Sequence, residues 1–198
     1  DTSCLSLIFP NTIEGKIIIL PIVFLPEDTA LNYLRRENIP YMTWAEEGEI
    51  HLTEGNVADY NFIEKKILEA ADKYKLHNIS FDRWNSNQLV NNLMDKGLEL
   101  SPFGQGWASM STPTKELERY ILQKNIIHNN NQLLRWQLSN VQIKADPAGN
   151  IKVAKDKSSG KVDAIVATVM AIGGWIIDMQ GDNTEGTSIY NDRGIIRL

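Results

Sequence analysis

The stretch HNISFDRW at residues 77–84 decides the fold, because it predicts a buried strand that ends in a single carboxylate. Ile79 and Phe81 alternate with polar residues, which is the period-two pattern of a strand. The segments on both sides, such as NFIEKKILEAADKY before it, have the spacing of amphipathic helices. We therefore expect a helix, strand, helix unit of an α/β sheet. Asp82 then lies at the carboxyl end of the strand, where open α/β sheets bind their ligands.

Asp82 has two interpretations at this point. It either contributes to a site at the strand end or caps the helix that follows. Asn85 and Ser86 are better placed to cap that helix, which favours a functional role for Asp82 without excluding the capping role.

Composition limits the class of protein. The chain has 198 residues, 42% of them apolar, which suits one domain with a full core. A net charge of −5 disfavours nonspecific coating of nucleic acid but allows an enzyme with a local basic face. Cys4 is the single cysteine, so we expect a reducing compartment and an inert buried thiol. The apolar runs are short and broken by proline, so we expect a soluble, cytoplasmic protein with no membrane span.

The other segments predict further elements of an α/β domain. SCLSLIF and KIIILPIVFLP predict an antiparallel hairpin with a central second strand, and VQIKADPAGNIKVAK predicts another hairpin. IPYMTWAEEGEIHLTEG predicts a loop with a small two-stranded excursion, in which Tyr41 and Trp44 pack. Thr112 and Pro113 predict the start of a helix, and an amphipathic helix begins at Lys161.

Asp163 lies in the first turn of that last helix. The helix macrodipole stabilises an acid there by roughly 0.3 to 1 kcal/mol without any catalytic role. The residues that follow, AIVATVMA, press on the sheet, so the carboxylate is also delivered to the sheet surface. An acid at a strand end and an acid on a packed helix make half of a two-metal nuclease site, in which Mg²⁺ or Mn²⁺ binds carboxylate oxygens and water.

Several long motifs, in order, resemble the carboxy-terminal nuclease domain of phage large terminase subunits: FDRWNSNQLVNNLMDKG, PFGQGWASMSTPTKELERYIL and NVQIKADPAGNIKVAKDKSSGKVDAIVATVMAI. The resemblance covers roughly residues 1–173. It implies an α/β, ribonuclease H-like fold, a mixed β-sheet with helices on both faces. It also implies an endonuclease that depends on Mg²⁺ or Mn²⁺ and cuts double-stranded DNA concatemers during genome packaging. The implied partners are DNA, the ATPase half of the large terminase, the small terminase and the portal, in the host-cell cytoplasm.

The resemblance assigns roles to individual acids. Asp82 corresponds to the strand-end acid of the family and Asp163 to its helix acid, and both are the expected metal ligands. Asp1 matches a second aspartate that opens the next strand, and we include it as a third candidate catalytic residue. The first strand and the principal acid of the family are then expected upstream of Asp1. We divide the chain into a nuclease domain, 1–174, and a carboxy-terminal tail, 175–198.

Basic residues near these acids are candidates for DNA binding. They are Lys155, Lys157, Lys161 and Arg83; the alternative for the lysines is a solvated loop. Gln105, in the GQG segment, resembles a family motif near the site. No GxxxxGK[ST] phosphate loop occurs in the sequence, so we do not expect this chain to translocate DNA alone.

Two other functions remain open from the sequence. In the first, the acids are solvated and the domain is a non-catalytic module that docks on DNA or on the portal. In the second, the chain is another ribonuclease H-like nuclease, such as a junction resolvase, which prefers branched DNA over linear DNA.

Overall fold

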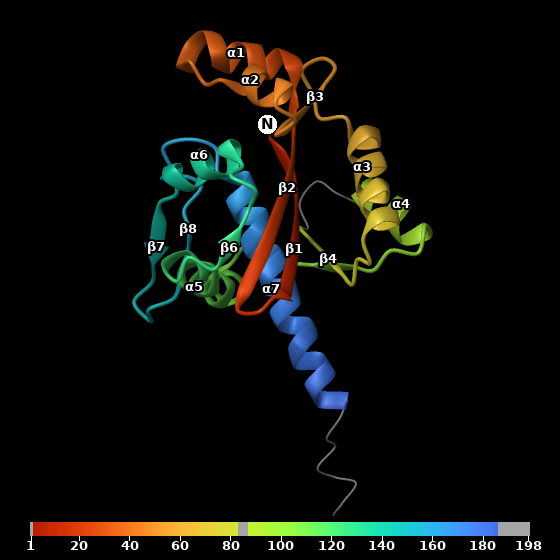
Figure 1. Ribbon diagram of the computed structural model, residues 1–198, viewed down its shortest axis with the longest axis vertical. Helices are drawn as coiled ribbons and strands as arrows, with labels where there is room; N and C mark the ends of the chain where they lie inside the picture. Colours follow the sequence, from red (N-terminus) through yellow and green to blue (C-terminus); the bar gives the residue numbers. More distant parts are fainter. Residues whose placement is uncertain (1, 83–86, 186–198) are drawn as a thin grey trace, which may run out of the picture.

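The computed structural model describes residues 2–82 and 87–185, without the side chains of residues 11, 87 and 181–185. Strands and helices alternate along the chain (Figure 1). The elements are β1 (Ser3–Ile13), β2 (Lys16–Pro26), α1 (Glu27–Glu37), α2 (Tyr41–Glu46), β3 (Ile50–Thr53), α3 (Tyr60–Lys73), β4 (Ile79–Phe81), α4 (Asn87–Asp95), β5 (Leu100–Pro102), α5 (Trp107–Leu122), β6 (Ile126–Ile127), α6 (Gln132–Asn140), β7 (Ile143–Ala145), β8 (Ile151–Val153) and α7 (Asp163–Glu185).

The hairpin of β1 and β2 is the centre of a mixed sheet. The two strands pair antiparallel along their whole length, and the turn between them places Gly15 at a φ of 68°, which glycine adopts without strain. The other edge of β2 pairs in parallel with β3 and with β6. Val23 and Leu25 are fully buried, as the apolar sequence of a central strand predicts.

A second, parallel pair of strands, β4 and β5, carries the unit predicted from the opening stretch. α3 and α4 flank β4 in sequence, which confirms the helix, strand, helix prediction. The two helices cover one face through a cluster that includes Phe24 of β2, Ile63 and Leu93, against which Leu5 and Ile79 pack. Since this cluster reaches both β1 and β4, the two pairs of strands share that face.

α7 covers the opposite face and touches both parts of the sheet. The hydroxyls of Ser6 on β1 and Thr168 on α7 lie 2.8 Å apart, and Gly174 abuts Ser80 of β4. In Figure 1, α7 crosses behind the hairpin of β1 and β2, and α3 and α4 lie to the right of the hairpin. The expected mixed sheet with helices on both faces is therefore confirmed.

The sheet is divided between β1 and β4. Among the residues that the structure describes, β1 pairs with β2 alone and β4 with β5 alone. β4 runs against the direction of α7, since Asn78 bonds to Asp178 and Ser80 lies at Gly174. Its carboxyl end is thus directed toward the first turns of α7.

Two local predictions were wrong. Residues 41–46 form helix α2 instead of a loop, and β3 pairs in parallel with β2 instead of forming a small excursion. The reason is tertiary, because Tyr41 and Trp44 are buried and their rings pack against each other and against Trp136 of α6, edge-to-face for Tyr41 and tilted between Trp44 and Trp136. Their burial in this cluster confirms the packing role expected for both aromatic residues.

The start of α5 also differs from the prediction at Thr112. The helix begins at Trp107 with Gly106 as its N-cap, and Pro113 lies inside it. Pro113 removes one hydrogen bond from the helix, but its ring is buried close to Gly173 of α7. Burial of the first turns of α5 against α7 therefore outweighs the local signal of the Thr-Pro pair.

α7 is longer than the sequence pattern indicates, since it continues through the first residues of the predicted tail to Glu185. The division at residue 174 stays a prediction. In the described chain α7 is the one helix long and apolar enough to cross a membrane by length and composition, yet 50% of residues 163–180 are buried. That burial is expected of a core helix.

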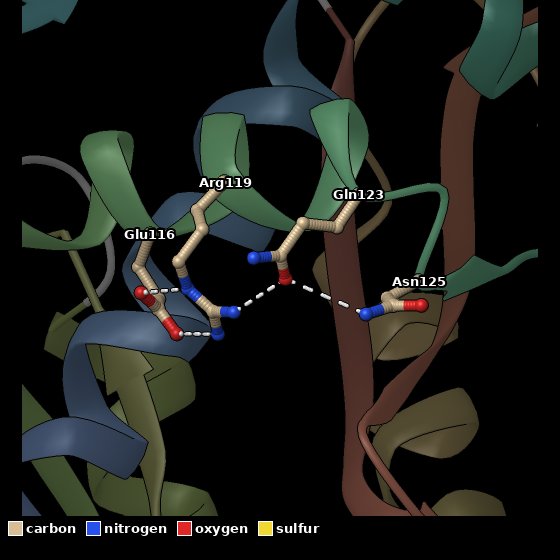
Figure 2. A network of polar contacts seen from close by, with 4 residues as sticks. All are labelled: Glu116, Arg119, Gln123 and Asn125. Carbon is tan, nitrogen blue, oxygen red and sulfur yellow. Dashed lines mark hydrogen bonds and ion pairs between the residues drawn. The ribbon is translucent and has the colours of Figure 1, made fainter.

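The last turn of α5 carries an exposed polar network (Figure 2). Arg119 forms an ion pair with Glu116 one turn earlier and donates to Gln123 Oε1 at 2.6 Å. Asn125 donates to the same oxygen at 3.4 Å. Because these groups are at the surface, they contribute little to stability, but they connect the end of α5 to the segment that leads into β6.

The close contact of α7 with Phe103, directly after β5, and with Pro113 of α5 generates a test. A Cβ added at Gly173 meets Phe103, with Cε2 at 2.6 Å, and Pro113 Cγ at 3.3 Å. We expect Gly173→Ala to lower the free energy of unfolding in urea by about 1 to 3 kcal/mol, because this packed site has no room for a methyl group.

The control for this substitution is the same change in a Phe103→Leu background. Leucine makes room at the contact, so the added methyl group should cost clearly less there. An equal cost in both backgrounds would show that the contact does not limit the approach of α7.

Candidate functional site

The first turn of α7 is held by buried amides of α6. Gln137, which is fully buried, accepts a hydrogen bond from the backbone N–H of Ala164 through Oε1 at 2.7 Å. Asn140 donates to the carbonyl of Lys161 at 3.2 Å. Since the first N–H groups of a helix have no partners within the helix, these side chains fix where α7 begins. They thereby fix the backbone at Asp163.

Asp163 lies between the apolar core and the surface. Its side chain is 23% exposed, and Oδ1 is 3.4 Å from Nζ of Lys155. Burial raises the pKa of the Cys4 thiol and of the Tyr41 hydroxyl, and the nearby Asp163 carboxylate raises both further. The thiol is therefore protonated at neutral pH, as expected of an inert cysteine. Since Cys4 belongs to β1, Asp163 lies at the sheet surface near the start of that strand.

Asp82 follows β4 directly and is held by Gln105 from the segment between β5 and α5. Gln105 Nε2 donates to Asp82 Oδ2 at 2.7 Å and lies 3.8 Å from the sulfur of Met170 on α7. The Asp82 carboxylate is therefore near α7 at the level of Met170. Roughly 10 Å of helix rise separates that level from Asp163.

A cavity of about 220 Å³ connects the partners of the two acids. Gln105, which is bonded to Asp82, and Lys155, which is paired with Asp163, both line it. The full lining is Gln105, Met110, Lys144, Lys152, Val153, Ala154, Lys155, Asp156 and Val166. A larger hollow of about 710 Å³ between the start of α3 and α4 is lined by neither acid and by neither of these partners, so we place the candidate site at the smaller cavity.

The predicted basic residues have different positions. Lys155 reaches Asp163, and Lys157 is exposed in the following turn. Lys161 is directed toward α1, with Nζ 5.9 Å from the ring centre of Tyr33. Asp1 and Arg83 lie outside the described residues.

The shared metal at Asp82 and Asp163 stays a prediction. Within residues 2–82 and 87–185, no group of three or more His, Cys, Asp or Glu side chains gathers at one place. The candidate acids within the described residues are Asp82, directly after β4, and Asp163, in the first turn of α7.

The sequence analysis missed two lysines of the β7–β8 hairpin. Lys144 and Lys152 are directly opposite each other in the hairpin register and both line the cavity. Lys152 Nζ donates to the carbonyl of Gln105 at 3.0 Å and lies 5.2 Å from the ring centre of Trp107. The signal was present, because a hairpin turning at Pro147 and Gly149 brings these two lysines to the same face.

The sequence profile described as "terminase large subunit, endonuclease domain" matches residues 1–178. The chain belongs to this family. It is 30% identical over 174 residues to the terminase large subunit of Enterobacteria phage HK97, covering 85% of this chain and 34% of that protein. It is 28% identical over 182 residues to protein YmfN of Escherichia coli K12, covering 87% of this chain and 40% of that protein.

A solved structure supports the same assignment. The crystal structure of the HK97 large terminase superposes with a TM-score of 0.81 at 29% identity, over 88% of this chain and 36% of that one. The predicted family and ribonuclease H-like fold are therefore confirmed. The chain spans little more than a third of the length of these large subunits.

The capping of α7 by Gln137 generates a test. In Gln137→Leu, the N–H of Ala164 stays buried without an acceptor, so we expect the free energy of unfolding to fall by about 1 to 3 kcal/mol. The exposed Arg135 of the same helix is the control, and Arg135→Ala should change stability by less than about 0.5 kcal/mol. Equal stabilities for the two variants would mean that Gln137 does not fix the start of α7.

Proposed function

We propose that this chain is a metal-dependent endonuclease domain that hydrolyses phosphodiester bonds of double-stranded DNA. The observation that carries the proposal is that Asp82 and Asp163 are each bonded to a side chain of the same basic cavity. The nuclease family supports the reaction class.

The two acids suit Mg²⁺ or Mn²⁺, because both ions prefer carboxylate oxygens and water. A pair of such ions activates the attacking water and stabilises the leaving oxygen. The residues of the chain orient the ligands, since Gln105 holds one oxygen of Asp82 and Lys155 offsets the charge of Asp163. Two carboxylates are few for two ions, so a further acid is part of the proposal.

We place that further acid on a strand between β1 and β4, supplied by residues upstream of Asp1 as the family resemblance implies. The divided sheet supports this position, because β1 and β4 both rest on α7 yet pair with different neighbours among the described residues. Unpaired strand edges within a covered sheet favour the addition of a strand.

The wider biological role follows from the family. The substrate is then a DNA concatemer that is cut during genome packaging in the host-cell cytoplasm. The partners are the ATPase half of the large terminase, the small terminase and the portal. These belong to the proposal, because the chain spans 34% of the HK97 large subunit.

Metal binding tests the assignment of the acids. We expect Asp82→Asn and Asp163→Asn each to weaken Mn²⁺ binding by calorimetry at least about tenfold, because each loses a charged oxygen ligand. Asp72→Asn, at an exposed acid of α3, is the matched control and should leave Mn²⁺ binding unchanged.

Retention of Mn²⁺ binding in both site variants would favour the docking module over the nuclease. Cutting of branched DNA in preference to linear DNA would favour a junction resolvase.

The length of the chain is tested separately. We expect the 198-residue chain to bind Mn²⁺ weakly and to cut plasmid DNA poorly. A chain extended upstream through one more strand should cut plasmid in the presence of Mn²⁺, because the added acid completes the ligand set. Equal cleavage by both chains would show that the third acid is misassigned.

A further inference from the structure

The β7–β8 hairpin contains a like-charged pair that its own stability does not explain. Lys144 and Lys152 are directly opposite each other, and like charges in that arrangement destabilise an antiparallel pair. Lys144 is offset by Asp156, whose two carboxylate oxygens both lie 2.6 Å from its Nζ. Lys152 has no carboxylate within ion-pair distance among the described residues. The cavity that both lysines line therefore retains the positive charge of Lys152.

Lys152 is also held in one position. Its ammonium group has three hydrogens to donate, and the carbonyl of Gln105 accepts one of them at 3.0 Å. The ring of Trp107, 5.2 Å away, faces the same cation. Within the described part of the chain, no other hydrogen-bond acceptor is assigned to this group. A fixed cation with spare donors loses little side-chain entropy when it binds an anion.

We propose that Lys152, with Lys144 and Lys155 around the same cavity, binds a phosphate of the DNA strand next to the phosphate that is cut. This proposal rests on the proposed function and names a substrate contact of that site. Gln105 links the two places, since its carbonyl accepts from Lys152 while its amide donates to Asp82. The DNA backbone is then positioned through one residue relative to the metal-binding acid.

The chemistry favours a phosphodiester over an acidic protein segment. The cavity of about 220 Å³ is lined by Gln105 and Lys155, the partners of the two acids to which we assign the nuclease reaction. A strand positioned for cutting brings phosphates to both sides of the reacting one, and lysine side chains commonly contact such phosphates.

DNA binding as a function of salt tests the subsite. Binding of a short labelled duplex is measured by fluorescence anisotropy in EDTA, so that no cutting occurs. We expect Lys152→Ala to weaken binding and to reduce the slope of log affinity against log salt by about 0.9, the value of one lost phosphate contact. Lys152→Arg keeps the charge and should retain the slope.

Lys16→Ala is the matched control, because Lys16 is exposed at the far turn of the β1–β2 hairpin. Its slope should equal that of the unchanged chain. Lys152→Gln, which removes the charge but keeps most of the length of the side chain, replaces Lys152→Ala if the latter does not fold by circular dichroism. An unchanged slope in the folded neutral variant overturns the subsite.

Mn²⁺ binding separates this outcome from failure of the proposed function. Asp82→Asn should weaken Mn²⁺ binding, whereas the control Lys16→Ala should bind Mn²⁺ as the unchanged chain does. If Asp82→Asn weakens Mn²⁺ binding and Lys152→Ala leaves the salt slope unchanged, the nuclease proposal stands and the subsite fails. If Asp82→Asn binds Mn²⁺ normally while Lys152→Ala lowers the salt slope, the metal-dependent nuclease proposal fails and phosphate binding at Lys152 stands.

Discussion

The contact of α7 with both parts of the sheet is the constraint on which the rest of the structure depends. Ser6 meets Thr168 on one side of the division, and Ser80 meets Gly174 on the other. The absence of a side chain at Gly173 and Gly174 lets the helix lie against β4 and β5. Through this contact, one helix orients the end of β4 and presents its own first turn beside the start of β1.

The local patterns that predict the fold are those in which propensity and burial agree. The strand before Asp82, the central β2 and the apolar face after Asp163 follow directly from periodicity. Helix α2 was not predicted, because its aromatic residues Tyr41 and Trp44 pack against Trp136, which is remote in sequence. The Thr-Pro pair at 112 and 113 predicted a helix start that packing against α7 overrides.

The positions of the two candidate acids at element ends were predictable from the sequence, and the directions of the lysine side chains were less so. Asp82 and Asp163 are marked by their element ends, whereas the direction of a lysine depends on packing. Lys161 lies two residues before Asp163 but extends over Tyr33. Lys152 lies eleven residues before Asp163 and reaches Gln105. The overall charge of −5 likewise gives no indication that Lys144, Lys152 and Lys155 line one cavity.

The pairing of the first strand with the last helix sets when the domain acquires its structure. Ser6 and Thr168 are separated by 162 positions, so their contact forms only after the intervening residues have been synthesised. Contacts of such high sequence separation slow folding, because a long loop must close before they stabilise anything. During synthesis, the face of β1 and β2 that α7 covers therefore stays exposed until α7 has been made. Both candidate acids reach their final surroundings only at the end of folding.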